Sequence, residues 1–112
     1  MGLCPDDKTI INEAIETYGR NVQTIVAIEE LSELQKELTK YLRSNGDKQH
    51  LEEEIADVEI MLEQIKIMYN ASDTAIENFH NSKMIRLWDR LGNIVNPDVT
   101  MNEEILGEIR MK

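Results

Sequence analysis

Apolar residues recur at spacings of three and four along most of the chain, and almost no stretch alternates with a period of two. This spacing is typical of amphipathic helices. It predicts four main helices, at about residues 8–18, 21–43, 49–69 and 73–91. The connections between them are short, which favours antiparallel neighbours. We therefore expect an all-α fold, a small antiparallel helical bundle.

Capping and turn-forming residues mark the expected helix ends. Asp6 or Asp7 can serve as the N-cap of the first helix, and Gly19 lies just past its end. The Ser-Asn-Gly-Asp cluster at 44–47 supplies the residues that a turn needs. Gly92 is expected to end the fourth helix.

The chain has 112 residues, the length of one ordinary domain, so 1–112 is expected to fold as a single domain. Its helical core would cover about 8–91, followed by a tail at 93–112. Pro97 interrupts the helical pattern, and Thr100 with Glu103 has the spacing of a capping box. The tail is therefore predicted to contain one more short helix.

The second half of the third predicted helix is apolar over much of its circumference. Ile60, Met61, Ile65, Ile67 and Met68 fall on several faces of that helix. A chain this short has few other residues that could pack against all of these side chains. We expect the excess to be buried against another subunit, in a homodimer or homotetramer.

Composition and charge narrow the classes of partner. Acidic residues outnumber basic ones by 22 to 12, for a formal net charge of −10, which disfavours polymeric nucleic acid as a ligand. No window is long and apolar enough for a membrane span, and no signal sequence is recognisable, so we expect a cytoplasmic protein. The single cysteine, Cys4, excludes an intrachain disulfide and a cysteine-rich zinc site.

The acidic residues concentrate on the second and third predicted helices. Residues 29–63 hold 11 of the 22 acids and only four bases. Glu30 and Glu33 form one pair at i, i+3, and Glu54 and Asp57 form another. This spacing projects both members of a pair from the same side of a helix.

An antiparallel hairpin would bring the two pairs together. With a turn at about 44–48, Glu33 and Asp57 are expected at levels that differ by only about 3 Å, at ~1.5 Å rise per residue. Converging carboxylates repel one another unless they are protonated or neutralised by cations. An all-oxygen donor set suits hard cations, Mg²⁺ or Mn²⁺, which can also hold a phosphate.

In these acidic motifs the sequence resembles the all-α nucleoside triphosphate pyrophosphohydrolases typified by MazG-like proteins, to which dimeric dUTPases are related. The hallmark of that superfamily is EExxE followed by ExxD on the next helix. Glu29-Glu30-Leu31-Ser32-Glu33 matches the first half, and Glu54-Ile55-Ala56-Asp57 matches the second after 20 intervening residues. The resemblance covers roughly residues 20–90.

The resemblance implies roles for five carboxylates. Glu30, Glu33, Glu54 and Asp57 would be the Mg²⁺ ligands, and Glu29 would lie beside them or orient the attacking water. The implied reaction is hydrolysis of a (deoxy)nucleoside triphosphate between the α- and β-phosphates, giving the monophosphate and pyrophosphate. Mn²⁺ is a possible substitute for Mg²⁺.

Basic residues of the fourth predicted helix are candidates to bind the phosphates. Lys83, Arg86 and Arg90 follow i, i+3, i+7 spacing, and Lys83 and Arg86 are the preferred pair. The alternative is a solvated basic stripe that pairs with acids of its own bundle or of a neighbour. In the resembling family the nucleobase lies in a mainly apolar pocket near the metal.

Two other functions use the same acidic residues. A ferritin-like di-iron centre needs two Glu-x-x-His motifs, and the chain has one, Glu77 to His80. A non-catalytic helical adaptor would carry the acids as a solvated face. Two like-charge pairs at i, i+4 weaken the helix, Glu29 with Glu33 and Glu33 with Glu37. They disfavour the adaptor function. Stabilisation by Mg²⁺ or Mn²⁺ separates the enzyme from the adaptor.

Overall fold

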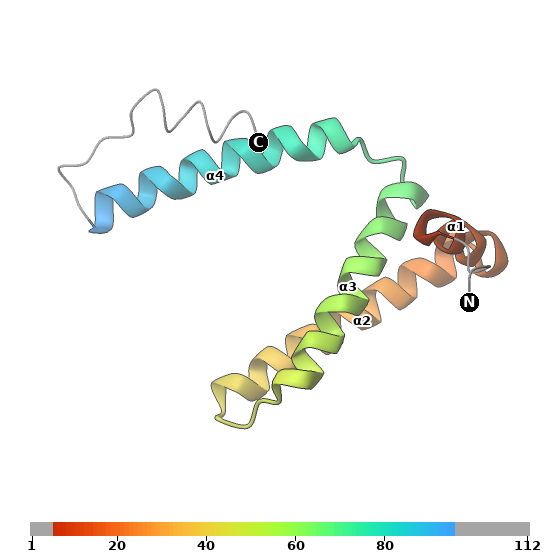
Figure 1. Cartoon of the computed structure of the whole chain (residues 1–112), viewed down its shortest axis with the longest axis horizontal. Helices are drawn as coiled ribbons and strands as arrows, with labels where there is room; N and C mark the ends of the chain where they lie inside the picture. The colour runs from red at the N-terminus through yellow and green to blue at the C-terminus, as the bar shows by residue number, and fades with distance from the viewer. Residues whose placement is uncertain (1–5, 96–112) are drawn as a thin grey trace. The chain divides into compact units, whose positions relative to one another are not determined.

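The computed structural model describes residues 6–95, and the side chains of residues 6–92. This part of the chain forms four helices and no strand (Figure 1). The helices are α1 (Asp7–Tyr18), α2 (Arg20–Leu42), α3 (Lys48–Met68) and α4 (Asp73–Val95). The all-α prediction and the predicted number of main helices are confirmed. The short helix predicted after Thr100 lies outside the described residues.

The contacts divide the chain after Ala71, so α1, α2 and α3 form one compact unit and α4 belongs to another. Within the first unit α2 and α3 make the most extensive contact, and both also contact α1. Figure 1 looks almost along the axis of α1, so α1 crosses α2 and α3 steeply. Antiparallel packing is therefore confirmed for α2 and α3, whereas α1 departs from an up-down arrangement. None of the helices within 6–95 has the length and apolar character that crossing a membrane requires.

The ends of α1 follow from two local interactions. Asp6 is the N-cap, because its side chain accepts a hydrogen bond from the backbone N–H of Thr9 at 2.8 Å. This bond lowers the pKa of Asp6 below its usual value. Gly19 has a φ of 88°, a conformation that side chains rarely allow, and its N–H donates to the carbonyl of Ile15 at 2.8 Å. The single residue Gly19 thus separates α1 from α2.

The turn between α2 and α3 depends on close backbone packing. Ser44 has a φ of 60°, and the N–H of Asn45 reaches back to the carbonyl of Lys40 at 2.8 Å. These features end α2 in a Schellman-type turn. Gly46 then passes against the ring of Tyr41, where a Cβ would collide with the ring carbons. The predicted turn residues are confirmed, with Asp47 as the N-cap of α3.

The prediction that Gly92 ends the fourth helix is wrong, because α4 continues to Val95. A glycine inside a helix costs about 1 kcal/mol relative to alanine, which the hydrogen bonds of a continuing helix can offset. Glycine ends a helix only when its backbone leaves the helical region. Gly92 keeps helical backbone.

A small core and one buried polar pair join α2 to α3. The buried apolar side chains are Ala27 of α2 and Val58 and Met61 of α3. Between the same two helices, the buried amide of Gln23 donates through Nε2 to Oε1 of Gln64 at 2.7 Å. This bond satisfies two amides in a buried environment and sets residue 23 opposite residue 64.

Replacing Gln64 with leucine is expected to destabilise the fold by about 1–3 kcal/mol, because the buried amide of Gln23 loses its partner. The double variant Gln23→Leu, Gln64→Leu removes both polar groups and is expected to recover most of that loss. Urea unfolding followed by circular dichroism measures both free energies. A double variant as unstable as the sum of the two single variants would show that the pair does not act as a hydrogen-bonded unit.

Candidate metal site

Three of the predicted acidic ligands come together between α2 and α3. Glu30, Glu54 and Asp57 each place a carboxylate oxygen so that all three oxygens lie within 4.8 Å of one another. Oxygens around Mg²⁺ at ~2.1 Å are separated by about 3–4 Å. Small side-chain movements would therefore contract this cluster onto a divalent cation.

Local helix geometry explains the cluster. Glu54 and Asp57 are one turn apart on α3, as their i, i+3 spacing predicts. Glu30 lies on the face of α2 that also carries Gln23 and Ala27, the face buried against α3. One carboxylate oxygen of Glu30 lies within 4.8 Å of an oxygen of Glu54 and of an oxygen of Asp57. Each helix thus delivers carboxylates to the same level of the hairpin.

The environment penalises negative charge in this cluster. Partial burial is the main cause that raises the pKa of Glu30 above its usual value. The negative charges of Asp57 and then Glu54 raise it further, as do hydrogen bonds to those two carboxylates. A proton or a cation relieves this repulsion.

The carboxylate of Glu54 also lacks an interaction that would stabilise its charge. Its Oε2 is buried and has no hydrogen-bond partner. A buried carboxylate oxygen without a partner is costly, at about 1–3 kcal/mol or more. An oxygen ligand to a hard cation is one way to satisfy it. The residues present therefore fit a Mg²⁺ or Mn²⁺ ion, which Glu30, Glu54 and Asp57 would hold.

Glu33 and Glu29, the other two predicted carboxylates, are outside this close group. Glu33 is half-buried and pairs with Lys36, with 3.3 Å between its Oε1 and Nζ of Lys36. Glu29 is exposed. The sequence placed Glu33 nearly level with Asp57, whereas in the structure the α2 carboxylate that joins Glu54 and Asp57 is that of Glu30.

Lys83 and Arg86, the predicted phosphate ligands, are exposed on α4. Arg90 follows them, exposed as well, at the spacing expected for one helix face. Because α4 belongs to a separate unit, their approach to the carboxylates stays a prediction.

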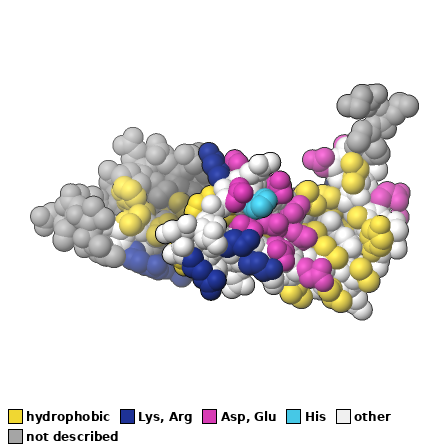
Figure 2. Space-filling model, turned by 90° about the horizontal axis from the view of Figure 1, so that it is seen from below, with side chains coloured by type: hydrophobic (Ala, Val, Ile, Leu, Met, Phe, Trp, Pro, Cys, Tyr) yellow, Lys and Arg dark blue, Asp and Glu magenta, His cyan; other side chains and the backbone are white. Residues whose placement is uncertain are grey.

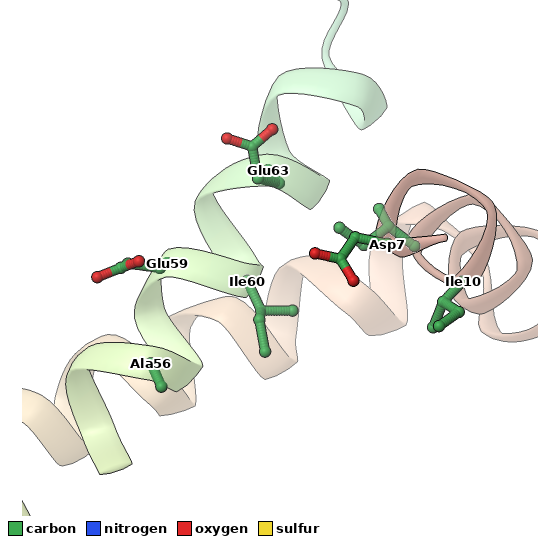
Figure 3. Close-up of a pocket in the computed structure, with 7 residues that line it drawn as sticks. Asp7, Ile10, Ala56, Glu59, Ile60 and Glu63 are labelled. Carbon is green, nitrogen blue, oxygen red and sulfur yellow. The ribbon is translucent and has the colours of Figure 1, made fainter. Parts of the chain in front are cut away.

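A groove lies between α1 and α3. Its volume is about 510 Å³, within the range of small-molecule sites. Ala56 and Ile60 flank Asp57 along α3 and contribute to the groove wall. Figure 3 shows Ile60 turned toward α1, while the carboxylates of Glu59 and Glu63 turn away from it. The groove therefore offers a mainly apolar surface between α1 and α3, and none of the three clustered carboxylates lines it.

One functional candidate was missed from sequence. Glu37 is buried, with a relative exposure of 6%, although it belongs to no recognised motif. Its Oε1 pairs with Nζ of Lys40 at 3.0 Å, and its Oε2 has no hydrogen-bond partner. The available signal was its i+7 spacing from Glu30, which places both on one face of α2.

Comparisons of the chain with protein-family models, with curated proteins and with solved structures found no match. The resemblance to MazG-like enzymes therefore depends on the motif residues themselves. The evidence for a function lies in the arrangement of the carboxylates.

The raised pKa of Glu30 predicts how the stability of the metal-free protein depends on pH. Folding favours the protonated carboxyl, so this stabilisation is complete below the ordinary glutamate pKa and is lost as pH rises through the raised value. Thermal unfolding with a chelator at a series of pH values measures it. Glu30→Gln should be more stable than wild type above that range and should lose this component of the pH dependence.

Comparing wild type with Glu30→Gln isolates the contribution of Glu30 to the pH dependence of stability. The comparison is needed because other groups change stability with pH in the opposite direction. Asp6, whose pKa is lowered, contributes stability that is lost as pH falls. Glu52→Gln, at an exposed position of α3, is the matched control and should follow the wild-type pH profile. Parallel pH profiles for wild type and Glu30→Gln would contradict the assignment.

Proposed function

We propose that the protein is a Mg²⁺-dependent nucleotide pyrophosphohydrolase, which cleaves a (d)NTP between its α- and β-phosphates. The observation that carries the proposal is the convergence of Glu30, Glu54 and Asp57 from two antiparallel helices. The order EExxE and ExxD on consecutive helices supports it. Mn²⁺ is proposed as a substitute for Mg²⁺.

The carboxylates provide what this reaction requires of the protein. A bound divalent cation would neutralise phosphate oxygens and lower the pKa of a water molecule. Glu30, Glu54 and Asp57 would hold the cation at a fixed level of the hairpin. Glu29, one residue before Glu30, is the proposed group that orients the attacking water. No covalent intermediate with the protein is needed.

The rest of the substrate would contact two further surfaces. Lys83 and Arg86 are proposed to bind the phosphates, since both are exposed cations on the predicted basic stripe of α4. The groove between α1 and α3 is the proposed surface for the nucleobase, because its wall of Ile10, Ala56 and Ile60 suits a flat, weakly polar ring. The groove leaves the choice among bases open.

A second copy of the chain is proposed to complete the fold, as a homodimer or homotetramer. The described α1–α3 unit buries only three apolar residues. Figure 2 shows hydrophobic side chains exposed beside acidic ones on the face seen there. Along α2, apolar residues at spacings of three, seven and four stay exposed: Ile28, Leu31, Leu38 and Leu42. This stripe has the heptad spacing of a helix–helix interface.

Hydrolysis is tested by incubating the purified protein with Mg²⁺ and a panel of canonical and modified (d)NTPs, resolving pyrophosphate from orthophosphate. We expect pyrophosphate and monophosphate from wild type. Glu54→Gln should lose activity by at least about a hundredfold, because it removes a proposed cation ligand. Glu52→Gln, exposed on α3 outside the cluster, should keep it.

The other outcomes have distinct meanings. Orthophosphate as the first product would indicate a different phosphatase reaction. No turnover of any triphosphate, together with no rise in melting temperature with Mg²⁺ or Mn²⁺, would contradict the proposal and favour a helical interaction protein.

Self-association is tested by light scattering coupled to size-exclusion chromatography. Wild type is expected to elute as a dimer or tetramer. Leu38→Lys places a charge in the α2 stripe and should shift the population toward monomer. Glu52→Lys changes an exposed position of α3 and serves as the control. A monomeric wild type at high concentration would exclude the interface.

A further inference from the structure

The turn between α2 and α3 contains two adjacent residues that can react with each other. Asn45-Gly46 is the one place in the sequence where asparagine precedes glycine. Both residues are exposed, and they lie outside the helices, between Leu42 and Lys48. An asparagine side chain can close a small imide ring with the next backbone nitrogen, and glycine has no Cβ to hinder that approach.

The backbone of this turn leaves the reacting nitrogen without a competing hydrogen bond. The N–H of Asn45 donates to the carbonyl of Lys40 at 2.8 Å, which holds Asn45 in the turn. Within residues 6–95, the N–H of Gly46 donates to no acceptor. The ring of Tyr41 lies where a Cβ of Gly46 would be, so it contacts this residue without engaging its N–H. The nitrogen of Gly46 therefore has no hydrogen bond to break before it reaches the side chain of Asn45.

Asn70 provides a matched contrast in the turn after α3. It is exposed and has a φ of 53°. The residue that follows is Ala71, whose Cβ hinders ring closure and whose N–H donates to the carbonyl of Lys66 at 2.9 Å. The other asparagines between residues 6 and 95 lie in helices: Asn12, Asn21, Asn78, Asn81 and Asn93. Their helical dihedrals oppose the rearrangement that ring closure requires.

We propose that Asn45 is a site of spontaneous deamidation, in which the backbone nitrogen of Gly46 attacks Cγ of Asn45. The bond between this nitrogen and Cγ forms, and the bond between Cγ and Nδ2 breaks. The departing nitrogen takes the backbone N–H proton and leaves as ammonia, so a succinimide ring remains in the turn. Water, the only co-reactant, then opens the ring at either carbonyl. The products are aspartate, and isoaspartate with the main chain running through the former side chain.

Deamidation would change the turn that joins the two helices of the acidic cluster. Isoaspartate adds a carbon to the backbone of a turn in which Ser44 has a φ of 60° and Gly46 packs against Tyr41. Both products place a negative charge just beyond the C-terminus of α2, the end of a helix dipole that disfavours anions. The isoaspartyl form should therefore be less stable than Asn45→Asp, which carries the same charge on an ordinary backbone.

The reaction is tested on the full chain by peptide mapping with mass spectrometry. The protein is held at physiological temperature in mildly alkaline buffer, and samples are digested over time under acidic conditions that suppress further reaction. Conversion from amide to acid should be several-fold faster at Asn45 than at Asn70, and isoaspartate should be among the products. Asn45→Gln keeps a side-chain amide but closes the larger ring slowly, so residue 45 should stay unchanged in this control variant.

Two results would overturn the proposal: an amide retained at residue 45 throughout the incubation, or equal rates at Asn45 and Asn70. The effect on stability is measured by thermal unfolding of the isoaspartyl fraction, separated by chromatography, beside Asn45→Asp. Equal melting temperatures would contradict the effect on the turn and leave the reaction in place. The measurements involve no cation and no nucleotide, so their outcome is independent of the proposed hydrolase activity.

Discussion

The register of α2 against α3 is the constraint on which the site depends. Three buried apolar side chains give this helix pair little shape specificity of their own. The hydrogen bond between Gln23 and Gln64 adds a directional requirement, because a shift of one turn would leave two buried amides unsatisfied. The carboxylates of Glu30, Glu54 and Asp57 meet between the same two helices, so their position depends on the same packing of α2 on α3.

That register imposes an electrostatic cost on the metal-free chain. Three carboxylates share a partly buried space, and the pKa of Glu30 is raised by burial and by its two neighbours. Buried oxygens of Glu37 and Glu54 have no hydrogen-bond partner. The proposed cation, held by Glu30, Glu54 and Asp57, would offset this repulsion.

The sequence predicted the helices well because their ends depend on local chemistry. Asp6, Gly19 and the turn at 44–47 act within a few residues of their own positions, so they can be recognised without the fold. The i, i+3 pairs were predictable for the same reason. The level at which two helices meet depends on the path of the turn, where Ser44 takes a positive φ and Gly46 packs on Tyr41. The carboxylate that joins Glu54 and Asp57 is therefore Glu30 and not Glu33. Glu37 is also buried, and only its i+7 spacing from Glu30 indicated that it shares the same face of α2.

Two faces of α2 carry the acidic cluster and the proposed subunit interface. One face carries Gln23, Glu30 and Glu37 toward α3, and another leaves Ile28, Leu31 and Leu38 in water. Glu30 and Leu31 are neighbours in sequence. A partner that covers the apolar stripe would therefore also restrain the helix that carries Glu30. Hydrophobic burial is worth roughly 25 cal/mol per Å² of apolar surface removed from water. A second copy on this stripe would thus supply the stabilisation that the small core lacks and that the clustered carboxylates reduce.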